Sequence, residues 1–131
     1  AYALLPKKLL RLGTKRWHPV GPVGAWKHPP SGAWVDAKGG WVAAPGDGAV
    51  YRVDEAAGGW KRHVPPITRP SGLWSRDGVE LWVGGTDGVA HFDGHTWRRV
   101  AGIDVDVLEI VGVGARVWFA GKGGVWAGTR L

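Results

Sequence analysis

The feature that most constrains this chain is a tryptophan-rich pattern that returns about every 40 residues. Corresponding tryptophans of two copies are separated by 40, 41 and 37 positions: Trp34 and Trp74, Trp41 and Trp82, and Trp60 and Trp97. Several short apolar segments per unit and a period near 40 are typical of repeat architectures such as β-propeller blades. The sequence therefore predicts stacked copies of one small unit, because a single unit cannot bury its own apolar faces.

Each copy divides into four short strands. In the middle copy we expect strands at 72–76, 80–86, 88–94 and 96–100. The first copy has corresponding segments at 32–36, 40–44, 48–54 and 60–64. The connectors of the middle copy contain the pairs Asp77-Gly78, Asp87-Gly88 and Asp93-Gly94, and Asp-Gly pairs supply the positive φ angles that hairpin turns require. The sequence therefore predicts a four-stranded antiparallel meander.

The two ends of the chain complement each other. The third copy supplies segments at 108–113, 117–121 and 124–130 but no fourth strand. Residues 9–20 align with residues 89–100 at a constant offset of 80, which places Trp17 on Trp97. We therefore expect an all-β β-propeller with three blades per chain, forming half of a six-bladed ring that a second copy or a missing half-propeller completes.

These boundaries describe one half-propeller domain over residues 1–131. It divides into a basic segment at 1–30 that provides third and fourth strands, blades at 31–70 and 71–107, and an incomplete blade at 108–131. The net charge of +6 resides in residues 1–30, which hold six basic residues and no acid. Lys and Arg on an exposed edge strand prevent edge-to-edge aggregation, and we expect this role rather than a nucleic-acid partner.

Composition excludes several classes of function. The chain has no cysteine, which rules out disulfides, thiolate catalysis and cysteine-bound zinc. No apolar run approaches the ~20 residues of a membrane span, so we expect a soluble protein, either cytoplasmic or, after processing, periplasmic or secreted. Residues 1–10 fit a processed start, a mature start or a cut within a longer chain equally well.

Two stretches resemble known propeller repeats. The segment ELWVGGTDGVAHFDG at 80–94 resembles the two-component-regulator propeller repeat, and HPPSGAWVDAKGGWVA at 28–43 is similar to NHL, regucalcin-like and virginiamycin-lyase-like blades. The resemblance covers about residues 9–131 and implies the propeller architecture. These motifs are structural, so no activity carries over with them.

The tryptophans are the main candidates for ligand binding. Eight of the ten occur at repeated positions, which favours blade-to-blade packing. Trp26 and Trp126 lie off the pattern, and an unrepeated aromatic face suits stacking against a sugar or a base. Together with the first-strand residues Trp34 and Trp74, they are the predicted ligand-binding residues.

No catalytic constellation is visible in the sequence. His91 and His95 have helical metal-site spacing but are expected to straddle a strand and a turn. Asp104 and Asp106 share one face of an extended segment, where a cation is the alternative to an ordinary polar loop. We therefore expect no catalytic residue, no metal and no cofactor.

Three hypotheses about function remain. The first is a non-catalytic binding or scaffold module that self-assembles as a homodimer or pairs with a missing half. The alternative is a carbohydrate-binding propeller lectin, with sugar held between blades. The second alternative is a metal-dependent hydrolase or lyase of the propeller type.

Overall fold

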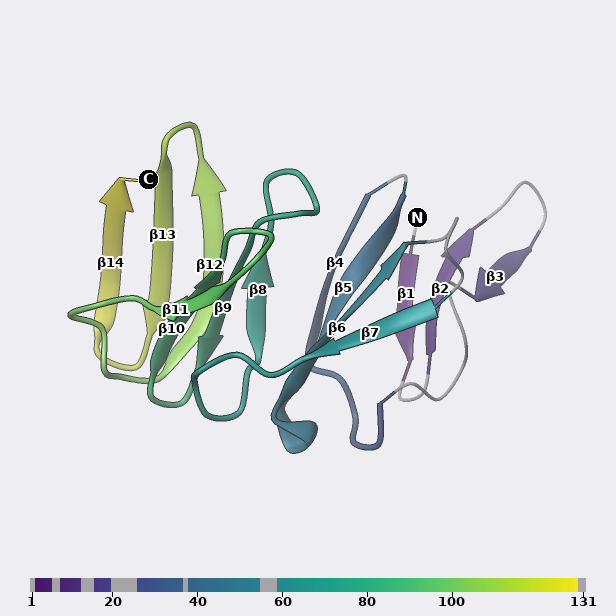
Figure 1. Ribbon diagram of the computed structural model, residues 1–131, viewed down its shortest axis with the longest axis horizontal. Helices are drawn as coiled ribbons and strands as arrows, with labels where there is room; N and C mark the ends of the chain where they lie inside the picture. Colours follow the sequence, from purple (N-terminus) through teal and green to yellow (C-terminus); the bar gives the residue numbers. More distant parts are fainter. Residues whose placement is uncertain are drawn as a thin grey trace.

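The computed structural model describes residues 2–5, 8–12, 16–19, 26–36, 38–54 and 59–129. Apart from one short 3₁₀ turn, η1 (Pro45–Asp47), every regular element in these residues is a β-strand. The strands form four antiparallel sheets that follow one another along the molecule in chain order (Figure 1). The expected all-β class is therefore confirmed.

Two of the sheets have four strands. Sheet B comprises β4 (Gly32–Val35), β5 (Gly39–Ala44), β6 (Ala49–Asp54) and β7 (Gly59–His63). Sheet C comprises β8 (Gly72–Trp74), β9 (Leu81–Gly85), β10 (Gly88–Phe92) and β11 (Trp97–Arg99). In both sheets the spatial order equals the chain order, as predicted for a meander.

The other two sheets have three strands in the described residues. Sheet A comprises β1 (Tyr2–Leu5), β2 (Lys8–Leu12) and β3 (Trp17–Pro19). Sheet D comprises β12 (Val107–Val113), β13 (Arg116–Gly121) and β14 (Gly124–Thr129). Sheets A and D lie at opposite ends of the row (Figure 1).

The strand registers show that the sheets are copies of one unit. Trp41 pairs with Trp34 on one side and Arg52 on the other, and Trp82 pairs in the same way with Trp74 and His91. In sheet D the corresponding row, listed across the strands, is Val111, Trp118 and Ala127. Val111 therefore holds in sheet D the position of Trp34 and Trp74, and the pairing of β12 with β13 has a register shift between Val107 and Glu109.

Sheet A contains one strand more than the sequence predicted. The expected third and fourth strands are β2 and β3, but residues 2–5 also pair with β2 as β1. Tyr2 lies opposite Arg11, as Trp82 lies opposite His91, so the offset of 80 extends to this strand. The sequence analysis missed β1 because it carries no tryptophan of the repeat. The chain thus forms four sheets instead of three blades and a spare pair of strands.

The core consists of three apolar clusters, one between each pair of successive sheets. Alternation along each strand sends neighbouring side chains to opposite faces. On β5, Val42 belongs to the cluster that includes Leu4 of sheet A, whereas Trp41 belongs to the cluster shared with sheet C. On β9, Trp82 likewise joins Phe119 of sheet D. The apolar side chains between two successive sheets are therefore buried because the two sheets pack against each other.

Glycines at the first strands allow successive sheets to approach closely. The Pro-Ser-Gly sequence occurs at 30–32 and again at 70–72. A Cβ at Gly32 would lie 3.0 Å from the Ser71 carbonyl oxygen, and one at Gly72 would overlap the Leu108 carbonyl. By cross-strand register the equivalent residue in sheet D is Glu109, which is exposed.

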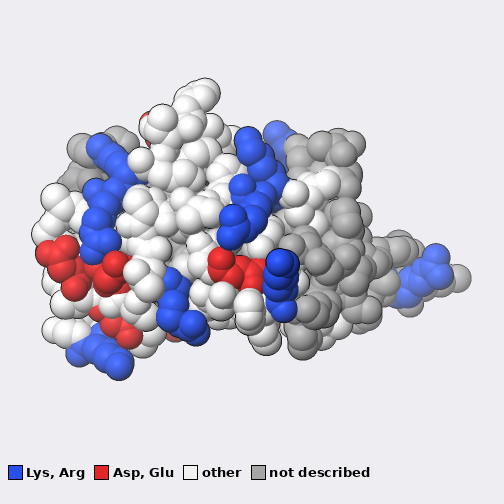
Figure 2. All heavy atoms as spheres, turned by 60° about the horizontal axis from the view of Figure 1, so that its bottom comes forward, with Lys and Arg blue, Asp and Glu red and all other residues white. Residues whose placement is uncertain are grey.

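Charged side chains of both signs share the surface. Figure 2 shows Lys and Arg in several separate groups, with Asp and Glu beside them. The Arg99 guanidinium lies 3.3 Å from the Asp87 carboxylate and 3.6 Å from the Asp104 carboxylate. Lys7 and Lys15 of the predicted basic segment lie outside the described residues.

Candidate functional site

The outer face of sheet D exposes several large apolar side chains in the described part of the chain. Its contributing side chains come from all three strands: Val111 and Val113 from β12, Trp118 from β13 and Val125 from β14. Arg116 lies over the Trp118 ring, with its guanidinium carbon 5.8 Å from the ring centroid. A contiguous apolar patch with a charged rim is typical of an interaction surface.

The same positions are buried in the preceding sheets. Trp118 is 38% exposed, whereas its register equivalents Trp41 and Trp82 are 1% and 6% exposed. Val125 is 67% exposed, and its equivalent Val89 is completely buried. The outer face of sheet D is therefore equivalent to the faces of sheets B and C that pack against the next sheet. In the described residues no sheet covers it.

A cavity of about 320 Å³ lies between sheets C and D. Its lining is mainly apolar, with two guanidinium groups: Trp82, Arg98, Arg99, Val100, Ala101, Val117, Phe119 and Gly128. Arg99 is held by Asp87 and Asp104, whereas Arg98 has no ion pair or hydrogen bond in the described part of the chain. The cavity thus combines aromatic walls with one uncompensated positive charge.

A second hollow, of about 380 Å³, runs along the first strands β4, β8 and β12. Ser31, Ser71 and Glu109 provide polar groups to it. The Ser31 hydroxyl donates to the Ser71 carbonyl at 3.0 Å, so this hydroxyl joins sheets B and C. The polar groups of this hollow thus serve in part to connect the sheets.

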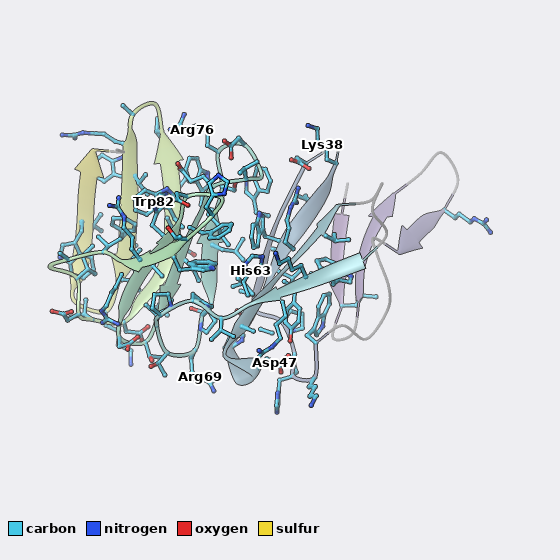
Figure 3. All side chains as sticks on the ribbon, in the orientation of Figure 1. Lys38, Asp47, His63, Arg69, Arg76 and Trp82 are labelled. Carbon is cyan, nitrogen blue, oxygen red and sulfur yellow. The ribbon has the colours of Figure 1, made fainter. Side chains whose placement is uncertain are left out.

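The Asp47 carboxylate is the most strongly hydrogen-bonded acid in the described residues. It accepts hydrogen bonds from the backbone N–H groups of Lys27 and His28, each at 2.9 Å, and from the Tyr51 hydroxyl at 2.7 Å. The His28 Nδ1 lies 2.6 Å away. Burial alone would raise the pKa of Asp47, but these bonds to Tyr51, Lys27 and His28 lower it to about 2. The carboxylate anchors the segment after Trp26 to η1 and β6, near the base of sheet B (Figure 3).

A small buried polar group lies on the face of sheet C that packs against sheet D. The Trp82 indole donates to Glu80 Oε1 at 2.9 Å, and His91 Nε2 lies 3.5 Å from Glu80 Oε2. The rings of Trp82 and His91 have centroids 4.2 Å apart. Burial lowers the pKa of His91, although Glu80 acts in the opposite direction. Ser75 makes a short contact to the Glu80 carbonyl, whereas His91 Nε2 is buried without a hydrogen-bond partner among the described residues.

The structure distributes the four predicted ligand-binding tryptophans over three junctions. Trp26 is 1% exposed and packs edge-on against Trp60, with ring centroids 5.2 Å apart. Its off-pattern position in the sequence predicts an exposed ring, whereas the structure places Trp26 in the core between sheets A and B. Trp34 packs against the next core cluster, and Trp74 and Trp126 pack against the last one.

The residues considered for catalysis or metal binding remain dispersed. Among the described residues, no three His, Asp or Glu side chains are close enough to hold a metal ion. Asp104 faces Arg99, and His95 donates its backbone N–H to Asp93 at 2.7 Å, as an Asx turn requires. The described part of the chain contains no helix long and apolar enough to cross a membrane.

No family profile, no curated protein and no solved structure matches the chain. Trp118 and Val125 are not among the residues predicted from sequence, because a periodic pattern makes every repeated position look equally buried. In the described residues no further strand pairs with β14 and no further sheet follows sheet D.

Proposed function

We propose that the protein is a non-catalytic scaffold, a β-propeller whose four sheets are blades and whose ring is closed by a second copy. In this arrangement the outer face of sheet D packs against sheet A of the partner. The two chains together contribute eight blades, which lies within the four to eight blades typical of propellers. This count replaces the six expected from sequence, because β1 makes the N-terminal strands a sheet of their own.

The observation that carries the proposal is the exposure of Trp118. Its equivalents Trp41 and Trp82 each pack into a core cluster shared with the following sheet. Exposed apolar surface gains roughly 25 cal/mol per Å² on burial. The outer face of sheet D would therefore be stabilised by packing against another sheet of the same kind.

Sheet A offers a suitable surface. Leu4 packs toward sheet B, while Leu5, one residue along β1, is exposed. By strand register β1 and β2 correspond to β9 and β10 of sheet C, and sheet C packs its Val83 and Ala90 against the preceding sheet.

Glu109 also supports a junction between sheet D and sheet A. At the other junctions, Gly32 and Gly72 give space for the first strand of the following sheet. In the described residues sheet A comprises β1, β2 and β3, with β1 in the second-strand position, so in the proposed dimer no described first strand of the partner would approach Glu109.

The proposal is tested by the mass of the purified chain in native mass spectrometry and light scattering. One chain has a mass of 14.0 kDa, and a closed dimer has twice that value. A species that stays at one chain over the whole concentration range up to hundreds of micromolar would overturn it. Small-angle scattering of the dimer distinguishes a closed ring from an extended pair.

A further inference from the structure

Between sheets B and C, aromatic rings fill the space beside the fourth strand. Phe92 ends β10 and packs against the Trp97 ring of β11, with ring centroids 4.9 Å apart. Trp97 in turn contacts His63 of sheet B, with centroids at 6.1 Å, and its indole N–H donates to His63 Nδ1 at 3.4 Å. The fourth-strand tryptophan therefore fills the gap between these two sheets.

The junction between sheets C and D lacks both rings. Gly128 pairs with Val117 as Phe92 pairs with Leu81, so glycine stands where the phenylalanine would be. No strand pairs with β14 on its other side among the described residues. The resulting cavity is the 320 Å³ space bordered by Gly128, Val100 and Phe119.

The register identifies what this cavity would hold. Val100 directly follows the fourth strand of sheet C, and its backbone N–H donates to the Val89 carbonyl. In sheet B, His63 pairs with Val50 in the corresponding position. His63 is the residue that receives the Trp97 indole. The cavity wall is therefore the equivalent of the surface on which a fourth-strand tryptophan rests.

We propose that the free edge of β14 and this cavity form a binding site for an extended peptide strand that inserts one tryptophan side chain. Main-chain hydrogen bonds to β14 would hold the strand, and the apolar pocket would select the indole. The peptide resembles the chain's own fourth strands, in which the tryptophan precedes basic residues: TWRRV at 96–100 and GWKRH at 59–63.

Basic residues next to the indole are compatible with Arg98 and Arg99. The chain already has two basic pairs in neighbouring sheets. Lys61 and Arg62 of β7 hold the same register positions in sheet B as Arg98 and Arg99 of β11 in sheet C. In both sheets these side chains are exposed, so water screens their repulsion. The site therefore does not require an acidic partner.

The test uses a seven-residue peptide with the sequence of residues 95–101, HTWRRVA, carrying 5-fluorotryptophan. The host is the full chain with Trp118→Lys, which removes competition from self-association. We expect saturable binding in calorimetry and a shifted, broadened ¹⁹F resonance. The peptide with alanine in place of tryptophan should bind at least about tenfold more weakly, because it loses the burial of the indole in the apolar pocket.

Two host variants at adjacent residues separate the faces of β14. Gly128→Phe restores the ring present at Phe92; Gly128 has an ordinary φ angle, and a Cβ there meets no atom within 4 Å. We expect this variant to stay folded, to unfold at a higher temperature and to lose peptide binding. Ala127→Phe places the same ring on the opposite face and should leave peptide binding unchanged.

Equal binding of both peptides, or undiminished binding to Gly128→Phe, would overturn the indole pocket. A host that is folded by circular dichroism but binds no peptide at millimolar concentration would overturn the site as a whole. These results are independent of the dimer, because the host is monomeric by design. A monomeric wild-type chain would contradict the proposed function and leave the peptide site standing.

Discussion

Trp82 and Trp118 occupy the same register position in neighbouring sheets, yet Trp82 is 6% exposed and Trp118 is 38% exposed. Phe119 lies 5.8 Å from Trp82, centroid to centroid, and belongs to the sheet that covers it. Trp118 is followed by no such sheet in the described residues. Identical residues at identical positions thus differ only in whether a neighbour is present.

Trp118→Lys should convert the self-associated protein to a single chain. A lysine at the centre of the apolar face would place an unpaired charge in the junction, at a cost of about 3 kcal/mol or more. We expect the dissociation constant of the dimer to rise by more than about a hundredfold, as measured by analytical ultracentrifugation. Because Trp118 is partly exposed, far-ultraviolet circular dichroism should not change.

The matched control for this variant is Val79→Lys. Val79 is also a large exposed apolar residue, but it lies in the connection between β8 and β9. The control should retain the mass of the wild-type protein. If both lysine variants dissociate equally, a general effect of charge on solubility explains the result and the sheet D interface is refuted.

Gly72→Ala should destabilise the fold strongly. The added methyl group would overlap the backbone carbonyl of Leu108, which cannot rotate away as a side chain can. We expect a loss of about 2 kcal/mol or more in the free energy of unfolding, measured by urea denaturation, because overpacking moves the strands apart. Gly59→Ala is the control: its Cβ meets no atom within 4 Å, and its unfolding free energy should stay within about 0.5 kcal/mol of wild type.

The regular parts of the fold could be predicted from sequence, because local patterns determine them. Thr86 and Asp87 form the turn between β9 and β10, and Gly88, which begins β10, has a positive φ. The role of Trp26 could not be found in the same way: its burial depends on Tyr51 and Trp60, which are distant in sequence. The open face at Trp118 reflects the absence of a following sheet in the described residues, which a periodic pattern does not indicate.

Asp47→Asn should destabilise the protein at neutral pH and alter its response to acid. The folded pKa of about 2 lies below the ordinary value of 3.8, so Asp47 contributes stability above pH 4. This contribution is lost as the pH falls from about 4 to 2. We expect the variant to lose about 2 kcal/mol at pH 7 and to show a flatter unfolding free energy between pH 4 and 2, measured in urea. Asp106→Asn, at an acid in a connecting segment, is the control and should retain the wild-type slope.

Stability should also decline between pH 7 and pH 5 because of His63. Burial lowers the pKa of His63, and the nearby Lys61 lowers it further. Its Nδ1 accepts the Trp97 indole N–H at 3.4 Å, and a protonated ring could not accept this bond. Below the unfolded pKa of about 6.5, His63 is protonated in the unfolded chain but stays largely neutral in the folded protein. The free energy of unfolding therefore decreases as the pH falls. The decrease is at most about 1.4 kcal/mol per pH unit for each such histidine.

His91 contributes in the same direction, because burial lowers its pKa as well. The contribution of His63 is distinguished from that of His91 with variants whose free energy of unfolding is measured in urea at pH 7.5, 6.5, 5.5 and 5.0. His63→Gln keeps an acceptor for the Trp97 indole but does not titrate, so it should reduce the slope by the share of one histidine. His95→Gln, at an exposed turn position, should keep the wild-type slope. A wild-type unfolding free energy that is constant from pH 7.5 to 5.0 would mean that His63 is protonated as readily in the folded protein as in the unfolded chain.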